Sequence, residues 1–256
     1  MATSSSPKNF NILTKPKRLL ARFLFGSKVM QGPFAGMRYI SNAVGSAYWP
    51  KWMGIYEREL TPVIDEICSR PFERIVDVGA AEGFYAIGFA LRYRGAQVVA
   101  FEADPEGQRL IGELARVNDV EAQVSILGFC DSWALSKAVR FKNTLLIMDV
   151  EGFEAELLNP AIVPELKSTE ILVELHEYLA PGLGDLLRQR FSESHKIAEV
   201  LPKARIIDDL PKKLQWFRFF FPWRVLQRVI FERPASLNGR VLEHSWLHLR
   251  PIHPGK

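Results

Sequence analysis

The chain has 256 residues, of which 48% are hydrophobic and 24% are charged, and its formal net charge is +4. These values predict one globular domain, or one domain with an appendage, and the mild positive charge argues against a dedicated nucleic-acid binder. Cys68 and Cys130 lie far apart, which argues against a disulfide framework or a structural zinc site and predicts a reducing, cytoplasmic location. No stretch approaches the ~18 consecutive apolar residues of a membrane span.

Residues 1–53 form a basic segment that we separate from the rest of the chain. No acidic residue precedes Glu57, and the apolar side chains among residues 19–24 can share one face of a short helix. Three interpretations stay open: a tail whose helix packs on the main domain, an amphipathic helix in peripheral contact with anionic membrane lipid, or an organelle transit peptide.

A helix is expected over residues 54–68, and a strand, a glycine turn and a new helix follow over residues 74–85. A dinucleotide-binding turn requires Gly-x-Gly-x-x-Gly, whereas this chain has Gly-x-x-x-Gly. Carboxylates just before and inside the turn, Asp77 and Glu82, attract a ligand with a sulfonium and an ammonium group. The turn therefore favours S-adenosylmethionine (SAM), and the residues expected to bind it are Asp77, Gly79, Ala80, Gly83 and Tyr85.

A second strand over residues 97–101 ends in Glu102. This carboxylate lies roughly 20 residues beyond the glycine turn, which is the spacing at which an acidic residue meets ribose hydroxyls. We expect Glu102 and Ala103 to bind the nucleoside part of the cofactor. The alternative for Glu102 is a solvated glutamate at the end of a strand.

The rest of the chain alternates strands and helices. Three helices are expected: one over residues 106–118, one that begins at residue 154, and one that ends at about residue 191. Strands are expected over residues 122–130, 144–148, 170–176, 197–201 and 246–249. This rhythm predicts a parallel sheet with helices on both faces. Ligands of such sheets bind at the carboxyl ends of the strands. The residues that the sequence places there are Asp77, Glu102, Asp131, Asp149 and Glu174.

Three of the residues at these ends have side chains suited to catalysis. Glu174 and His176 are two apart on one strand and face the same way, and His176 is the predicted general base unless it is only a hydrogen-bonded strand-end histidine. Asp149 is expected to contact the SAM amino group or an acceptor, or else to cap the following helix. The same three residues offer ligand atoms for a divalent metal, but their spacing matches no dedicated motif and no metal site is predicted.

Two further cofactor contacts are expected. Asp131 would bind the adenine amino group while Cys130 packs beside the ring, unless Asp131 is only a turn aspartate. Glu57 would close over the methionine part of SAM.

Residues 212–231 are rich in aromatic and basic side chains. Three interpretations of this segment stay open. It is an insertion whose aromatic residues pack on the sheet, or a lid over the acceptor, or a patch that contacts a membrane or lipid. In the lid interpretation Trp216, Phe219 and Trp223 would stack on the acceptor.

The sequence resembles the class I SAM-dependent methyltransferases, and among them the FkbM family. The similarity is carried by residues 76–85, 101–105, 148–154 and 173–176, with Asp149-Val150-Glu151-Gly152 as its most specific part. It extends over residues 56–176. The pair Ala81-Glu82 departs from the family, whose members usually carry Asn and a small or apolar residue there.

The resemblance implies a Rossmann-like α/β fold with a mostly parallel seven-stranded sheet and a reversed last strand. It also implies methyl transfer from SAM to a hydroxyl oxygen of a small-molecule or glycan acceptor, such as a sugar or a secondary metabolite. Residues 54–256 are the expected methyltransferase domain. Two other functions stay open. One is a catalytically silent protein of this fold that binds a membrane or a partner, and the other is a nicotinamide-dependent oxidoreductase, whose glycine fingerprint is missing.

Overall fold

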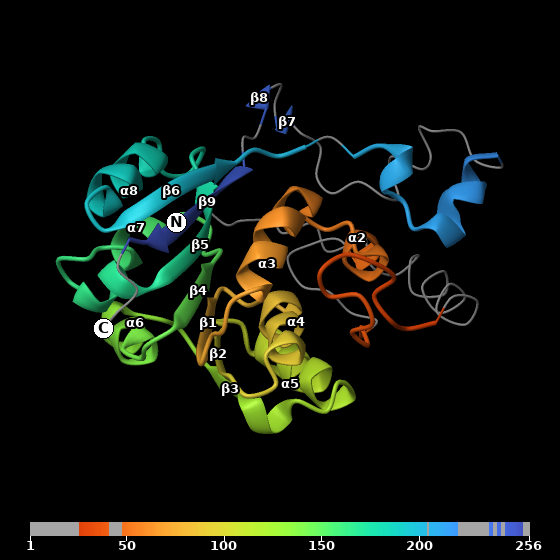
Figure 1. The fold of residues 1–256 in the computed structure, drawn as a ribbon, viewed down its shortest axis with the longest axis horizontal. Helices are drawn as coiled ribbons and strands as arrows, with labels where there is room; N and C mark the ends of the chain where they lie inside the picture. The colour runs from red at the N-terminus through yellow and green to blue at the C-terminus, as the bar shows by residue number, and fades with distance from the viewer. Residues whose placement is uncertain are drawn as a thin grey trace, which may run out of the picture.

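The computed structural model describes residues 26–40, 48–203, 205–219, 236–237, 240–241 and 244–252. Its central element is a seven-stranded sheet with the order β3-β2-β1-β4-β5-β9-β6 (Figure 1). The strands of this sheet are β1 (Arg74–Val78), β2 (Gln97–Phe101), β3 (Val124–Leu127), β4 (Thr144–Met148), β5 (Glu170–His176), β6 (His195–Val200) and β9 (His244–Pro251). Two short strands, β7 (Ser236–Leu237) and β8 (Arg240–Val241), pair separately.

The sheet is parallel except at one edge. Strands β3, β2, β1, β4 and β5 pair in parallel, whereas β9 lies between β5 and β6 and is antiparallel to both. A mostly parallel sheet of seven strands with one reversed strand confirms the predicted fold class. Strands β1, β4 and β5 are buried along almost their whole length, since both faces of the sheet are covered.

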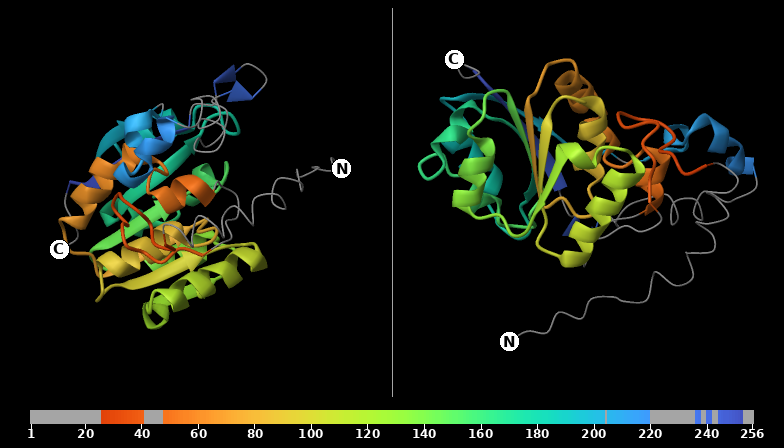
Figure 2. Two further views of the ribbon diagram at one scale, coloured as in Figure 1. Left: turned by 90° about the vertical axis from the view of Figure 1, so that its right-hand side faces the viewer. Right: turned by 90° about the horizontal axis from the view of Figure 1, so that it is seen from below.

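Helices cover both faces of the sheet, as Figure 2 shows. One face carries α3 (Thr61–Cys68), α4 (Phe84–Arg92) and α5 (Pro105–Val117), and the other carries α6 (Ser132–Val139), α7 (Glu154–Leu157) and α8 (Leu183–Phe191). Neighbouring strand residues point to opposite faces, so Ile75 belongs to one apolar cluster and Val76 to the other. The connections include the 3-10 helices η1 (Arg58–Leu60), η2 (Glu121–Gln123), η3 (Pro164–Ser168), η4 (Ile207–Asp209) and η5 (Lys212–Phe219).

The described part of the amino-terminal segment packs against α4, next to η4 (Figure 1). The Phe34 ring lies 5.2 Å from that of Phe89, and Nε2 of Gln31 donates to the carbonyl oxygen of Asp209 at 2.6 Å. Residues 26–40 and helix α2 (Tyr48–Met53) contribute to the same apolar cluster as the sheet. The predicted boundary after residue 53 therefore does not mark the edge of the packed structure.

The predicted helix over residues 19–24 lies outside the described residues. The lipid-binding and transit-peptide interpretations therefore stay predictions. In the described part of the chain, no helix has the length and apolar character required to cross a bilayer.

Two predicted elements differ from the structure. The helix expected from residue 54 begins only at Arg58, because Gly54 and Glu57 adopt positive φ angles of 71° and 41° that a helix does not allow. The strand expected up to residue 130 ends at Leu127, and a helix that the sequence did not predict, α6, begins at Ser132.

Candidate functional site

The turn between β1 and α4 brings the backbone against the end of β4. Gly79 has a φ angle of 83°, and a Cβ atom at this position would lie 1.8 Å from the carbonyl oxygen of Asp149. The N–H groups of Gly79 and Ala80 both donate to the carbonyl oxygen of Phe101 at 3.0 Å, and Gly83 starts α4. A side chain at position 79 would collide with β4, so only glycine permits this turn.

Glu82 does not face a ligand, contrary to the sequence expectation. It is fully buried, and its Oε1 accepts hydrogen bonds from the Tyr39 hydroxyl and from Nζ of Lys51, each at 2.6 Å. A buried carboxylate requires a partner, and the amino-terminal segment supplies two. The pairing with Lys51 gives a physical reason for a glutamate at position 82.

Asp77 is buried on β1, and its Oδ2 accepts from the N–H of Ala86 at 2.9 Å. Burial raises the pKa of Asp77 to about 7, against the lowering effect of this hydrogen bond, and the nearby charge of Glu102 adds to the rise. The carboxyl group therefore changes its charge near neutral pH. A cationic ligand at the turn would favour the ionised form.

Glu102 is fixed at the end of β2 by two backbone hydrogen bonds. Its Oε2 accepts from the N–H of Ala81 at 2.6 Å and its Oε1 from the N–H of Asp104 at 2.8 Å. Each carboxylate oxygen can accept more than one hydrogen bond, so the group keeps capacity for hydroxyls of a ligand. Glu102 is half-buried, and Ala103 beside it is exposed.

Asp131 has a local structural role. Its Oδ1 accepts from the N–H of Ala134 at 2.7 Å, which makes it the N-cap of α6. Cys130 is buried beside it, and burial raises the pKa of its thiol. The expected contact of these residues with adenine stays a prediction.

Carboxylates surround His176 at the carboxyl ends of β4 and β5. Nδ1 of His176 lies 2.6 Å from Oε1 of Glu154, while Nε2 lies 3.5 Å from Oδ1 of Asp149 and 3.7 Å from Oε2 of Glu174. The turn after β4 allows this contact because Glu151 and Gly152 adopt positive φ angles of 50° and 103°. The N-cap position of α7 belongs to another residue, so Asp149 does not cap that helix. Two of the runs that carry the family resemblance thus form one buried cluster.

His244 reaches the same cluster from β9. The antiparallel register pairs it directly with His176, and the two ring centroids are 5.5 Å apart. Nδ1 of His244 lies 3.3 Å from Oε1 of Glu174. The structure therefore joins Asp149, Glu154, Glu174, His176 and His244, which we call the strand-end cluster.

Charges in the strand-end cluster stabilise one another. Burial lowers the pKa of His176, but the hydrogen bond with Glu154 and the negative neighbours outweigh burial and leave that pKa raised. Burial also favours the neutral form of Glu174, but His244 and His176 outweigh it and lower the pKa of the carboxyl group. The cluster thus favours ionised carboxylates beside a positive charge.

Sequence reasoning missed Glu154 and His244. Glu154 belongs to the run 148–154 that carries the resemblance, so a signal for it was present. His244 gave no signal, because its place depends on the reversal of β9 and on a strand register that distant sequence segments do not reveal.

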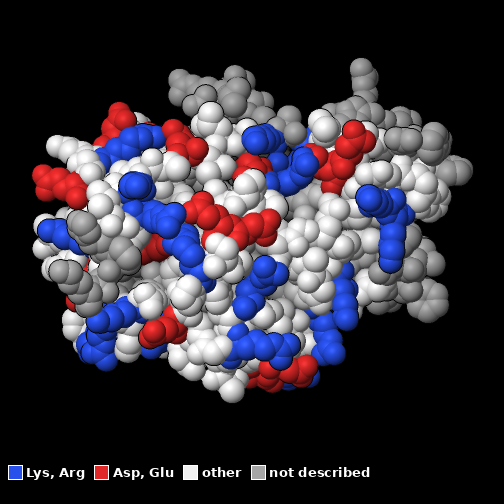
Figure 3. All heavy atoms as spheres, in the orientation of Figure 1, with Lys and Arg blue, Asp and Glu red and all other residues white. Residues whose placement is uncertain are grey.

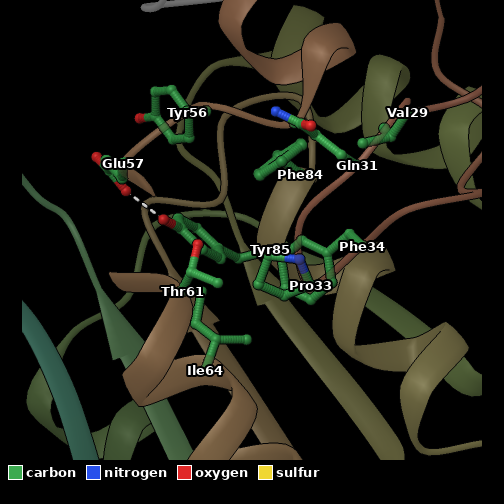
Figure 4. Close-up of a pocket in the computed structure, with 11 residues that line it drawn as sticks. Val29, Gln31, Pro33, Phe34, Tyr56, Glu57, Thr61, Ile64, Phe84 and Tyr85 are labelled. Atoms are coloured by element: carbon green, nitrogen blue, oxygen red, sulfur yellow. Dashed lines mark hydrogen bonds between the residues drawn. The ribbon is translucent and has the colours of Figure 1, made fainter. Parts of the chain in front are cut away.

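Glu57 and Tyr85, both expected at the cofactor, contact each other. The Tyr85 hydroxyl donates to Oε2 of Glu57, and both side chains line the cavity shown in Figure 4 together with Gln31 and Phe34. The cavity measures about 10 Å³, which is room for roughly one water molecule. This cavity is therefore too small for a cofactor.

The insertion over residues 212–231 is described only through Phe219. Leu214 is buried in the core, while Trp216 is exposed. Trp223 lies outside the described residues, and so does the side chain of Phe219, so the lid stays a prediction. On the face drawn in Figure 3, basic and acidic side chains are interspersed.

Comparisons with solved structures place this fold among methyltransferases. P. horikoshii TYW2 in complex with MeSAdo is similar over 84% of this chain and 68% of its own, with 17% identity and a TM-score of 0.50. A candidate rRNA-methylase from Clostridium thermocellum matches 77% of this chain and 97% of its own, with 8% identity and a TM-score of 0.50. Precorrin-6y C5,15-methyltransferase from Geobacter metallireducens matches 74% of this chain and 87% of its own, with 11% identity and a TM-score of 0.47.

The structural similarity to the first two, each with a TM-score of 0.50, shows the Rossmann-like methyltransferase fold and nothing finer. No protein-family model matches the sequence, and no curated protein matches it significantly.

Proposed function

We propose that the protein is a SAM-dependent methyltransferase of the FkbM type that binds its cofactor at the carboxyl ends of β1 and β2. The observation that carries this proposal is the hydrogen bond from the N–H of Ala81 to Glu102. It links the glycine turn to the acidic residue at the end of the next strand, so the two expected cofactor contacts form one rigid unit.

The residues of this unit suit the chemistry of SAM. Glu102 is positioned to accept hydrogen bonds from ribose hydroxyls, and ionised Asp77 provides the negative charge that favours the cationic methionine part. Gly79 allows the turn to approach the backbone of Asp149, which a side chain at this position would prevent. When bound, SAM supplies an electrophilic methyl group.

The strand-end cluster is the proposed acceptor site, and a hydroxyl group is the proposed acceptor. Glu154 fixes Nδ1 of His176, which leaves Nε2 directed toward Asp149 and Glu174. In its neutral form His176 would accept the proton of a bound hydroxyl group at Nε2, and the raised pKa of His176 makes this form less populated. The expected product is a methyl ether on a sugar, a glycan or a secondary metabolite.

Calorimetric titration with SAM and S-adenosylhomocysteine tests the cofactor. We expect the wild type to bind both and Glu102→Ala to bind both at least tenfold more weakly, because the ribose loses a charged hydrogen-bond partner worth about 1.5–3 kcal/mol. Glu106→Ala is the matched control, since Glu106 is exposed on the adjacent helix and should leave affinity unchanged. Binding of NADH in place of SAM would indicate the oxidoreductase instead.

The acceptor requires a separate experiment. Incubation with methyl-labelled SAM and pools of glycans, lipids and small metabolites should label an alkali-stable ether. Persistent silence across all pools, in a protein that binds SAM, would favour the catalytically silent alternative.

A further inference from the structure

We propose that Glu174, His176 and His244 form a binding site for one divalent transition-metal ion. The three side chains come from the facing ends of β5 and β9, and their potential ligand atoms all lie within 4.8 Å of one another. The cluster combines two imidazoles with one carboxylate, a donor set that suits Zn²⁺ or Co²⁺ better than Mg²⁺.

The spacing of the ligand atoms fits a tetrahedral ion. Ligands about 2.0–2.2 Å from one Zn²⁺ ion are about 3.4 Å apart along each edge of the tetrahedron. The structure gives 3.3 Å between Oε1 of Glu174 and Nδ1 of His244, and 3.7 Å between Oε2 of Glu174 and Nε2 of His176, so each histidine faces a different oxygen of the same carboxylate. Because the ligand atoms of the three residues lie within 4.8 Å of one another, the side chains have to move closer together to surround an ion.

Buried ring nitrogens provide an independent indication. Nε2 of His176 and both ring nitrogens of His244 make no hydrogen bond within the described residues, although all three atoms are buried. The side chain of His176 is only 1% exposed, and its Nε2 points into the cluster. A buried polar atom without a hydrogen bond is unfavourable, and metal ligation would give each of these nitrogens a partner.

Glu154 completes the pattern from behind. A histidine that binds a metal commonly donates its second ring N–H to a carboxylate, which fixes the tautomer and raises the basicity of the ligating nitrogen. Nδ1 of His176 lies 2.6 Å from Oε1 of Glu154 on the side away from the other ligands. Glu154 is therefore a positioning residue for the proposed ion.

The ion would have a role in catalysis that rests on the proposed function. Three protein ligands leave a fourth position for an acceptor oxygen, and a bound Zn²⁺ ion strongly lowers the pKa of such a group. The acceptor O–H bond breaks and its proton passes to Asp149, whose Oδ1 is 3.5 Å from Nε2 of His176. The oxygen then bonds to the methyl carbon, while the electrons of the C–S bond remain on sulfur. In the loaded protein His176 is thus a ligand, and Asp149 replaces it as proton acceptor.

Metal titration of the full chain tests the site. After treatment with a chelator, the wild type should bind one Co²⁺ or Zn²⁺ per chain by equilibrium dialysis, with the visible spectrum of a tetrahedral Co²⁺ site, and should bind Mg²⁺ far more weakly. His244→Ala should abolish the spectrum, and Glu154→Gln should weaken binding about 10–100-fold. His248→Gln is the matched control, because His248 contacts Glu170 at 2.8 Å in the same two strands but outside the cluster.

The outcomes separate the metal site from the proposed function. Co²⁺ binding that His244→Ala removes and His248→Gln leaves intact supports the site, whether or not the protein binds SAM. Failure of the wild type to bind either ion, equal losses in both histidine variants, or preference for Mg²⁺ would overturn it. A cooperative melting transition of His244→Ala shows that this variant is folded. Because His244 lies outside the cofactor unit, His244→Ala of a SAM-binding protein should also bind S-adenosylhomocysteine as the wild type does.

Discussion

Replacement of Lys51 by methionine should strongly destabilise the protein. Lys51 is 3% exposed and Glu82 is fully buried, and their charged atoms are 2.6 Å apart. Loss of one partner from a buried ion pair costs about 3–5 kcal/mol, because the remaining charge stays desolvated. The Tyr39 hydroxyl still donates to Glu82. We therefore expect the lower end of this range, about 3 kcal/mol, or a melting temperature lower by about 6–12 °C.

Urea denaturation of four proteins tests this expectation. The double variant Lys51→Met/Glu82→Gln should recover most of the loss, since no unpaired charge remains in it. Arg38→Met is the matched control from the same segment, because its ion pair with Asp119 is exposed and is worth at most about 1 kcal/mol. The reasoning is refuted if Lys51→Met is no less stable than Arg38→Met, or if the double variant is less stable than Lys51→Met alone.

Four further predictions concern the glycine turn, Asp77 and the N-cap of α6. Gly79→Ala should abolish SAM binding and lower the melting temperature, because its Cβ atom would lie 1.8 Å from the carbonyl oxygen of Asp149, just after β4. Unchanged calorimetry and melting would contradict the turn geometry. With a pKa of about 7, Asp77 is protonated below neutral pH, so SAM should bind about tenfold more weakly near pH 6 than near pH 8, and this dependence should be absent in Asp77→Asn. Because the pKa of Asp77 is higher in the folded state, protonation of Asp77 stabilises that state; this contribution is fully present below about pH 4 and is lost as the pH rises through 7. Without ligand, Asp77→Asn should therefore have a higher melting temperature than the wild type near pH 8. Asp131→Ala should lower the free energy of unfolding by about 1 kcal/mol in denaturant titrations, because it removes the N-cap of α6. An unchanged free energy of unfolding would contradict the capping role and would favour a ligand-binding role for this carboxylate.

The fold was predictable because its signals are local. Strand β1 and the turn at Gly79 appear as an apolar run followed by glycine, and the alternation of strands and helices predicts a parallel sheet without knowledge of any contact. The reversed strand was implied only by the family resemblance, since the sequence of β9 contains no sign of its direction.

The site was predictable only in part, because its missing members depend on distant contacts. Asp149 and His176, which the structure brings together, were expected at the site from their positions at strand ends. The pairing of Glu82 with Lys51 could not be found, because it depends on how the amino-terminal segment packs. His244 was missed because it joins His176 only through the register of β9 with β5.

A crystal structure of the complex with S-adenosylhomocysteine tests the central claim most directly. We predict the ribose hydroxyls on the carboxylate of Glu102 and the amino-acid part of the ligand at the Gly79–Ala80 turn. Density for the ligand at any other place on the sheet, or none at saturating concentration, would contradict the account.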